Sequence, residues 1–192
     1  YLAWRERNAN KDDTRILVAR SLDGGKHWDE TTHKLAVGDH LGPPHLQAGP
    51  NGALYVAWVG GDESRRVLAV ATSQDSGGTF APTPARLQPV FTESDRGITS
   101  PRLATDDKGR VYAVWEEATK RKGDSGIYLS RSEDHGRTWS EPVKILGSLK
   151  PDGCINLSVG LVTLRDGSLL YPCCDARITR ACSYDRAGLG WR

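Results

Sequence analysis

The chain has 192 residues, of which 38% are hydrophobic and 26% charged, and its formal net charge is +2. No apolar run approaches the roughly 20 residues of a membrane-spanning helix, and basic residues do not cluster with aromatic ones, so neither a membrane span nor a nucleic-acid surface is indicated. The composition is typical of a globular domain. Because methionine is absent, we expect a mature product or a fragment of a longer chain.

An eight-residue pattern, Ser-x-Asp-x-Gly-x-x-Trp, occurs at residues 21–28 and 132–139, and at 73–80 with phenylalanine in the last place. A degraded copy with one added residue follows at 183–191. Asp and Ser side chains accept hydrogen bonds from nearby backbone N–H groups and glycine permits a positive φ, so each octet is predicted to form a tight turn. Its aromatic side chain should be mostly buried and attach the turn to its unit. The residues with this structural role are Ser21, Asp23, Gly25, Trp28, Ser73, Asp75, Gly77, Phe80, Ser132, Asp134, Gly136 and Trp139.

Segments rich in β-branched and aromatic residues flank each octet and predict strands. In chain order these are residues 1–4, 15–20 and 33–37, then 55–58, 67–71 and 85–90, then 112–115, 126–131 and 142–146. The turn sequences Pro50-Asn-Gly52 and Asp107-Lys-Gly109 follow strand-like residues 44–47 and 101–104, so a hairpin is expected before the second and third octets. Each unit is therefore predicted to hold four antiparallel strands, with the octet between the third and the fourth.

Four-stranded units that repeat every roughly 40 to 60 residues are typical of propeller blades. The sequence therefore predicts an all-β fold, a β-propeller of four-stranded antiparallel blades that span approximately residues 1–43, 44–99, 100–150 and 151–192. The first unit starts at its second strand, so we expect about three and a half blades of a larger propeller, or alternatively a ring assembled from several chains. Open sheet edges favour association, and the isolated chain is expected to be unstable or to self-associate unless the remaining blades of a parent chain cover it.

The connections between second and third strands differ most among the units, and variable loops on a rigid scaffold commonly carry function. They comprise residues 5–13, 60–66 and 116–124. In the first, Arg5 and Arg7 share a face by strand alternation and precede the adjacent carboxylates Asp12 and Asp13. Guanidinium groups bind carboxylates, and a loop aspartate near a substrate can donate a proton. Solvated loop charge without a function is the alternative.

All four cysteines, Cys154, Cys173, Cys174 and Cys182, fall near the end of the chain. They contain no Cys-x-x-Cys pair, so no zinc site is expected, and buried thiols or one cross-strand disulfide are favoured. We predict no metal and no other cofactor. The cysteines do not identify the cellular compartment, and a secreted or cell-surface location is slightly favoured.

The octets resemble the Asp-boxes, or BNR repeats, of the sialidase (neuraminidase) superfamily, over essentially the whole chain. This resemblance implies a six-bladed propeller whose Asp-boxes lie on the outer rim, away from the active site. In sialidases a Glu-x-Arg segment is followed by an Asp and by an apolar strand that leads to an Asp-box, and residues 4–7 (Trp-Arg-Glu-Arg), Asp12, residues 16–18 and residues 21–28 resemble that order. The resemblance implies that Arg7 is one of the arginines that bind the sialic acid carboxylate and that Asp12 is the acid/base. Arg5, on the same face as Arg7, is a second substrate-binding candidate.

Residues 160–172 resemble a later strand pair of the same superfamily, but no Arg-Ile-Pro segment precedes Tyr1 and no tyrosine nucleophile or glutamate partner can be assigned. The expected function is that of an exo-α-sialidase-like glycoside hydrolase, incomplete in this chain, which releases terminal sialic acid from glycoconjugates. The expected partner is a sialylated glycan or other carbohydrate. A non-catalytic Asp-box propeller that binds glycan or protein is the alternative, and a structural repeat protein without a small ligand is the third.

Overall fold

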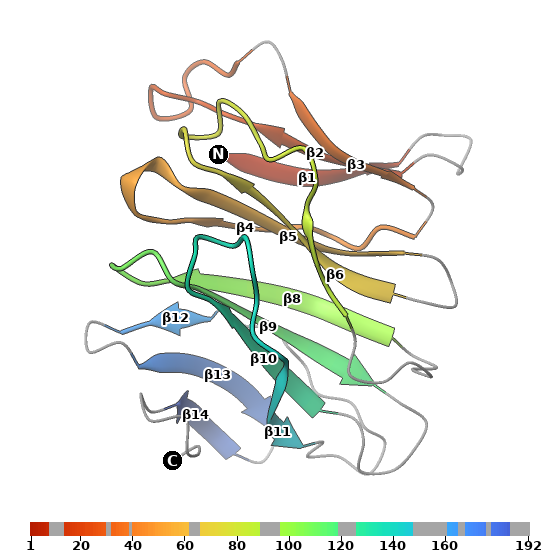
Figure 1. The fold of residues 1–192 in the computed structure, drawn as a ribbon, viewed down its shortest axis with the longest axis vertical. Helices are drawn as coiled ribbons and strands as arrows, with labels where there is room; N and C mark the ends of the chain where they lie inside the picture. Colours follow the sequence, from red (N-terminus) through yellow and green to blue (C-terminus); the bar gives the residue numbers. More distant parts are fainter. Residues whose placement is uncertain are drawn as a thin grey trace.

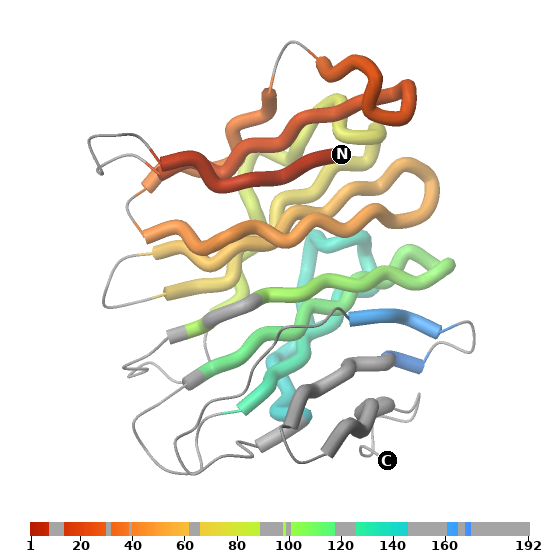
Figure 2. The backbone as a smooth tube through the Cα atoms, turned by 180° about the vertical axis from the view of Figure 1, so that it is seen from behind, coloured from red at the N-terminus to blue at the C-terminus, as the bar shows by residue number. Residues whose placement is uncertain are grey.

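The structure is a computed structural model that describes residues 1–7, 14–29, 32–38, 40–61, 66–88, 97–118, 126–147, 161–164, 168–175 and 178–184. Its strands form four antiparallel sheets that succeed one another in chain order along the long axis of the molecule (Figure 1). The view from behind shows the same succession (Figure 2). This arrangement confirms the prediction of an all-β propeller fold with antiparallel blades.

Each sheet is a meander in which neighbouring strands are also consecutive in sequence. The first sheet contains β1 (Leu2–Arg7), β2 (Thr14–Ala19) and β3 (His33–Gly38). The second contains β4 (His45–Ala48), β5 (Leu54–Gly61), β6 (Arg66–Ser73) and β7 (Ala85–Leu87). The third contains β8 (Gly97–Thr105), β9 (Val111–Ala118), β10 (Gly126–Ser132) and β11 (Val143–Gly147). The fourth contains β12 (Val162–Thr163), β13 (Leu169–Asp175) and β14 (Ile178–Tyr184). A 3-10 turn, η1 (Pro50–Gly52), joins β4 to β5 where a turn was predicted.

The central strands are hydrophobic on both faces because each inner sheet packs between two others. In β5, Tyr55 and Val59 pack into a cluster shared with the third sheet, whereas Leu54 and Trp58 pack into a cluster shared with the first. A third cluster joins the third sheet to the fourth. Strands covered on both faces lose the alternation of polar and apolar residues, which explains the continuous apolar sequence of β5.

The octets form the turns that lead to the last strand of the first three sheets, as predicted. In the third octet, Ser132 Oγ accepts a hydrogen bond from the Gly136 N–H at 2.8 Å and donates one to Asp134 Oδ1 at 2.8 Å. Asp134 also accepts bonds from the Thr138 N–H at 2.8 Å and hydroxyl at 2.6 Å. The second octet repeats these four bonds, and the first replaces the threonine hydroxyl with the ring of His27.

The aromatic residues of the second and third octets pack toward the preceding sheet. Trp139 contacts the cluster between the second and third sheets, and Phe80 contacts the cluster between the first and second. Trp28 is 45% exposed, so the prediction that it is mostly buried is wrong. No described sheet precedes the first one, and Trp28 therefore lacks the surface on which its counterparts pack.

The hydrogen bonds of the octets predict a loss of stability in acid. Bonds from the Thr138 side chain and backbone hold the pKa of Asp134 at about 2, below its ordinary value of 3.8. Because the folded-state pKa is lowered, the ionised carboxylate stabilises the fold above about pH 4, and this contribution is lost as the pH falls from 4 toward 2. Asp134→Asn should therefore unfold in less urea than the wild type at pH 6, with the difference closing toward pH 2.

A matched control is available in the same turn. Glu133 is exposed and forms a surface ion pair with Arg131 at 2.9 Å, and such pairs contribute little to stability. Glu133→Gln removes the same charge and should leave the urea midpoint nearly unchanged from pH 6 to pH 3. A pH-independent effect of Asp134→Asn would contradict the role assigned to its ionised form.

Candidate functional site

A cavity with a volume of about 460 Å³ is lined by residues of the first three sheets. These residues lie toward the strand ends opposite the octet turns, and Figure 1 shows the two ends of the sheets. We call this cavity the arginine pocket. The residues that line it are Arg5, Arg7, His40, Leu41, Gly42, Pro43, Pro44, Val59, Arg66, Ile98, Pro101 and Arg102. Three separate sheets supply its arginines, so only the folded stack of sheets assembles it.

Backbone hydrogen bonds fix one wall of the pocket, the segment of residues 40–44. The Gly42 N–H donates to the carbonyl of Val59 at 2.8 Å, which attaches this segment to β5. Arg5 Nη1 donates to the carbonyl of Leu41 at 3.0 Å, which joins the segment to β1. Since Arg5 and Arg7 occupy alternate positions of β1, their side chains leave the strand on the same side. The pocket is therefore formed in the free protein.

The described lining is strongly basic. Four arginines and one histidine line the pocket, and none of the lining residues that the structure describes is acidic. Guanidinium groups stay protonated at physiological pH and present paired N–H donors that match a carboxylate or a phosphate. The arrangement is thus suited to hold a small anion.

His45 lies beside the pocket and is neutral at physiological pH. Burial, together with the charge of Arg102, lowers the pKa of His45 to about 4. The Leu103 N–H donates to His45 Nδ1 at 3.2 Å, so the remaining proton of the neutral ring lies on Nε2. His45 therefore connects β4 to β8 through a hydrogen bond without adding positive charge.

The structure describes some of the predicted site residues and not others. The structure places Arg5 and Arg7 together in the pocket, while their role in binding stays a prediction. Asp12 and Asp13 lie outside the described residues. The octet residues are absent from the described lining of the pocket, in keeping with a structural role at the opposite strand ends.

Sequence reasoning missed three basic residues that line the pocket, His40, Arg66 and Arg102. Arg66 ends a connection that the sequence singled out, but there it was one charge among several. Arg102 lies in a segment that was interpreted only as a strand, because the residues that share the pocket come from distant parts of the chain. They come together only through the packing of successive sheets, for which the sequence around each residue holds no signal.

The third connection also begins later than predicted. Glu116 and Glu117 were assigned to a loop, but both belong to β9, where they pair with Thr99 and Ile98 of β8. Glu117 is completely buried and Glu116 is 8% exposed. Directly paired residues of antiparallel strands share a face, so Glu117 lies on the side of the sheet that Ile98 presents to the pocket. A buried carboxylate needs polar or charged partners. The position of Glu117 places such a carboxylate behind the wall of the arginine pocket.

Neither a metal centre nor a membrane helix emerges from the described part of the chain. The described residues contain no group of three or more His, Cys, Asp or Glu side chains that could hold a metal ion. Among them there is also no helix with the length and apolar character needed to cross a membrane.

No family model matches the chain. A curated sialidase of Bacteroides fragilis (strain YCH46) is 26% identical over 160 residues, which cover 82% of this chain and 24% of that protein. The chain therefore spans about a quarter of the length of this relative.

Solved structures of carbohydrate-active enzymes share the fold. The Hadza microbial sialidase Hz136 superposes with a TM-score of 0.55 at 20% identity, over 93% of this chain and 44% of that one. The α-L-arabinofuranosidase Arb93A of Fusarium graminearum, solved with an iminosugar inhibitor, superposes with a TM-score of 0.66 at 14% identity, over 99% of this chain and 57% of that one. At such identities the likeness concerns the fold alone.

Proposed function

Because the chain folds as successive blades of a sialidase-like β-propeller, we propose that it supplies the carboxylate-binding part of a sugar site in an exo-α-sialidase-like glycoside hydrolase. Such an enzyme releases terminal sialic acid from glycoconjugates. The observation that carries the proposal is the arginine pocket, in which Arg5, Arg7, Arg66 and Arg102 converge from three sheets.

The chemistry of sialic acid suits this pocket. The sugar carries a carboxylate on its anomeric carbon, and charge-assisted hydrogen bonds from arginine to a carboxylate contribute about 1.5–3 kcal/mol each. The volume of about 460 Å³ falls in the range of roughly 300–1,000 Å³ that is typical of small-molecule sites. Because four arginines and no acidic residue are among the described lining residues, the positive charge of the pocket favours an acidic ligand over a neutral sugar.

A second candidate is a non-catalytic propeller that binds an anionic glycan. The polar side chains that line the described pocket are guanidinium and imidazole groups, which suffice for binding. Hydrolysis additionally requires Asp12 as proton donor and a nucleophile that the sequence does not assign. Both candidates therefore bind their ligand in the arginine pocket, and only the hydrolase cleaves it.

We expect N-acetylneuraminic acid to bind the protein more tightly than its methyl ester, which has nearly the same shape without the charge. Arg7→Ala and Arg66→Ala should each weaken binding of the acid about ten- to hundredfold, because each removes charge-assisted hydrogen bonds worth about 1.5–3 kcal/mol. Isothermal titration calorimetry measures both comparisons.

Lys26→Ala is the matched control, since it removes one positive charge from an exposed position in the first octet. It should leave binding unchanged. Release of sialic acid from sialyllactose would support the hydrolase, and tight binding without release would favour the binding propeller. Equal affinity for the acid and the ester would contradict both.

A further inference from the structure

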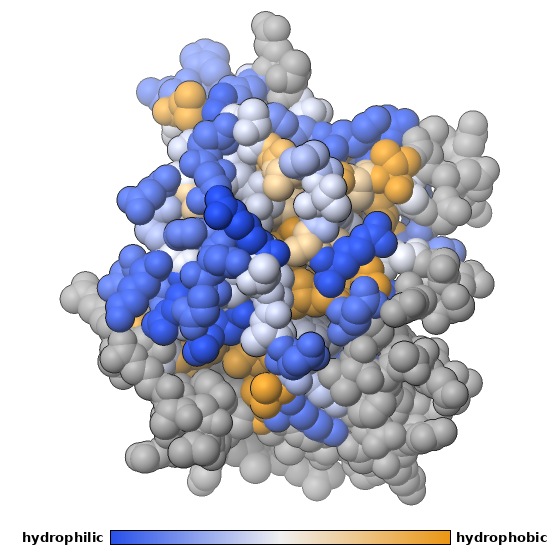
Figure 3. Space-filling model, in the orientation of Figure 1, coloured by the Kyte–Doolittle hydropathy of each residue, from blue (hydrophilic) through white to orange (hydrophobic). Residues whose placement is uncertain are grey.

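A second cavity, with a volume of about 570 Å³, lies between β7 of the second sheet and the turn that ends the third octet. We call it the rim groove, and it shares no described lining residue with the arginine pocket. The residues that line it are Ala85, Arg86, Leu87, Gln88, Arg137, Trp139, Ser140, Glu141 and Pro142. Figure 3 shows this face of the molecule, on which hydrophobic residues are interspersed among hydrophilic ones.

The rim groove exists because one small residue replaces a large one. In the first sheet His33 pairs with Val18, and in the second sheet Ala85 pairs with Val70. Val18 and Val70 each precede the serine of their octet by three residues, so His33 and Ala85 occupy equivalent positions. The ring of His33 contacts that of Phe80, with centroids 5.3 Å apart, and occupies the space in front of this octet aromatic.

Alanine leaves the corresponding space in front of Trp139 open. Trp139 Nε1 donates to the carbonyl of Gly136 at 3.1 Å, and its ring packs on the cluster that contains Leu87. These contacts fix the indole as one wall of the groove. The C–H face of a sugar ring is apolar and can pack on such an indole, which offers a large apolar surface with a negative π-face.

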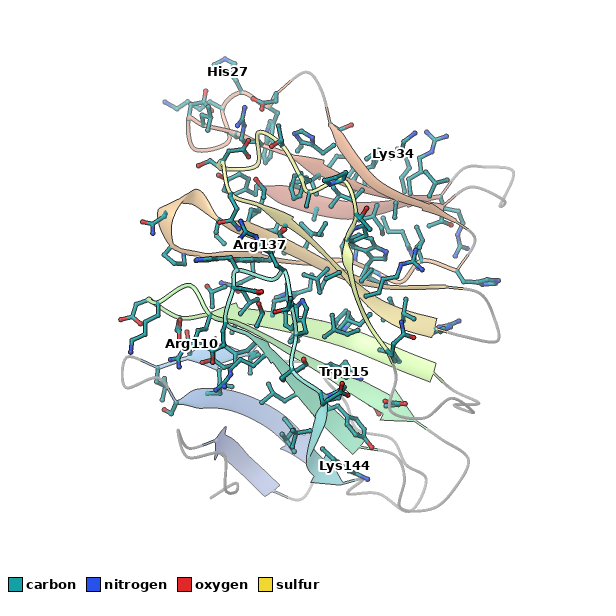
Figure 4. All side chains as sticks on the ribbon, viewed as in Figure 1. His27, Lys34, Arg110, Trp115, Arg137 and Lys144 are labelled. Atoms are coloured by element: carbon teal, nitrogen blue, oxygen red, sulfur yellow. The ribbon has the colours of Figure 1, made fainter. Side chains whose placement is uncertain are left out.

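Two exposed guanidinium groups flank the indole. Arg137 projects from the turn that reaches over the second sheet (Figure 4), and Arg86 extends from β7. No ion pair engages either side chain within the described part of the chain. The carboxylate of Glu141 lies in the same lining, where it reduces the net charge and can accept hydrogen bonds from hydroxyl groups.

We propose that the rim groove is a second sugar-binding site that takes a pyranose unit with one negatively charged group, its ring against Trp139 and its anion between Arg86 and Arg137. The site lies apart from the arginine pocket and does not depend on the function proposed for that pocket. Two such sites on one molecule would increase the avidity for a glycan with several acidic units.

The test uses the variant Arg7→Ala/Arg66→Ala, in which binding at the arginine pocket is weakened. N-acetylneuraminic acid, galactose 6-sulfate and galactose are titrated while the indole N–H signal of Trp139 is followed by NMR, assigned from Trp139→Phe. We expect the acid or the sulfate to shift this signal and galactose to bind at least tenfold more weakly. A preference between the two anions identifies the charged group, and equal binding of all three sugars would overturn the proposal.

Ala85→His should fill the rim groove as His33 fills the equivalent space, and should weaken binding of the anionic sugar at least tenfold. Ala81→His is its control, because Ala81 is exposed and absent from the described lining, and it should leave binding unchanged. Arg86→Gln, a change at an exposed side chain that leaves the core intact, should also weaken binding and serves if Ala85→His does not fold. Unchanged affinity in Arg86→Gln, or in a folded Ala85→His, would overturn the proposal.

Discussion

Replacing Gly136 with alanine is expected to lower the free energy of unfolding by about 2–5 kcal/mol. The backbone of Gly136 has a φ of +83°, which costs a residue with a Cβ about 1–2 kcal/mol. A Cβ at this position would lie 2.7 Å from Cγ2 of Thr72 and 3.4 Å from the ring of Tyr55, both in the second sheet. Such overpacking typically costs a further 1–3 kcal/mol.

Gly25 in the first octet offers a control with similar backbone strain and no close contact with another sheet. Gly25 has a φ of +88°, and the nearest heavy atom to an added Cβ is in Trp28 of its own octet, at 4.0 Å. Gly25→Ala should therefore cost only about 1–2 kcal/mol. Urea denaturation measures both losses, and their difference isolates the contact between sheets. Equal losses would show that the octet stabilises only its own sheet.

Much of this local structure could be predicted from the sequence because each octet contains its own hydrogen-bonding partners. Ser132, Asp134 and Thr138 lie within a few residues of one another, and their bonds form inside the turn. The same holds for the strands, whose β-branched and aromatic residues identify them locally. Because the units repeat, the same antiparallel order of strands could be expected in every sheet.

The packing partners of individual side chains could not be predicted, because a repeat does not say which side chains of a sheet meet its neighbour. The three octet aromatics look alike in sequence, yet Trp28 is exposed while Trp139 packs on the second sheet. The same limit applies to Glu117, whose charge suggested a loop and whose cross-strand partner Ile98 places it in the buried end of β9.

Of the arginines in the arginine pocket, the sequence prediction named only Arg5 and Arg7. Arg5 and Arg7 lie on one strand, so alternation alone puts them on one face. Arg66 and Arg102 enter the same pocket from two other sheets, and only the stacking of sheets makes them neighbours. The strands and turns of the scaffold can therefore be predicted from local sequence patterns, whereas a basic pocket of this kind cannot.

The largest effect on activity is expected from Asp12→Asn in a protein that hydrolyses sialosides with these blades. The resemblance to sialidases implies that Asp12, five residues beyond Arg7, is the proton donor. A carboxylate nucleophile would be repelled by the carboxylate on the anomeric carbon of the substrate, which leaves the aspartate to handle protons. General acid catalysis contributes about 10²–10⁴-fold, so kcat/KM for a natural sialoside should fall by at least about a hundredfold.

The same variant should retain most activity toward an aryl sialoside, because an activated phenol departs with little protonation. Asp13→Asn is the matched control: Asp13 is adjacent in sequence, but the offset from Arg7 in the sialidase pattern falls on Asp12, so both substrates should be hydrolysed nearly as fast as by the wild type. Steady-state kinetics with sialyllactose and the aryl substrate separate these outcomes. Equal losses in the two variants, or a loss confined to Asp13→Asn, would refute the assignment of Asp12, since neither result follows from a single proton donor at that position.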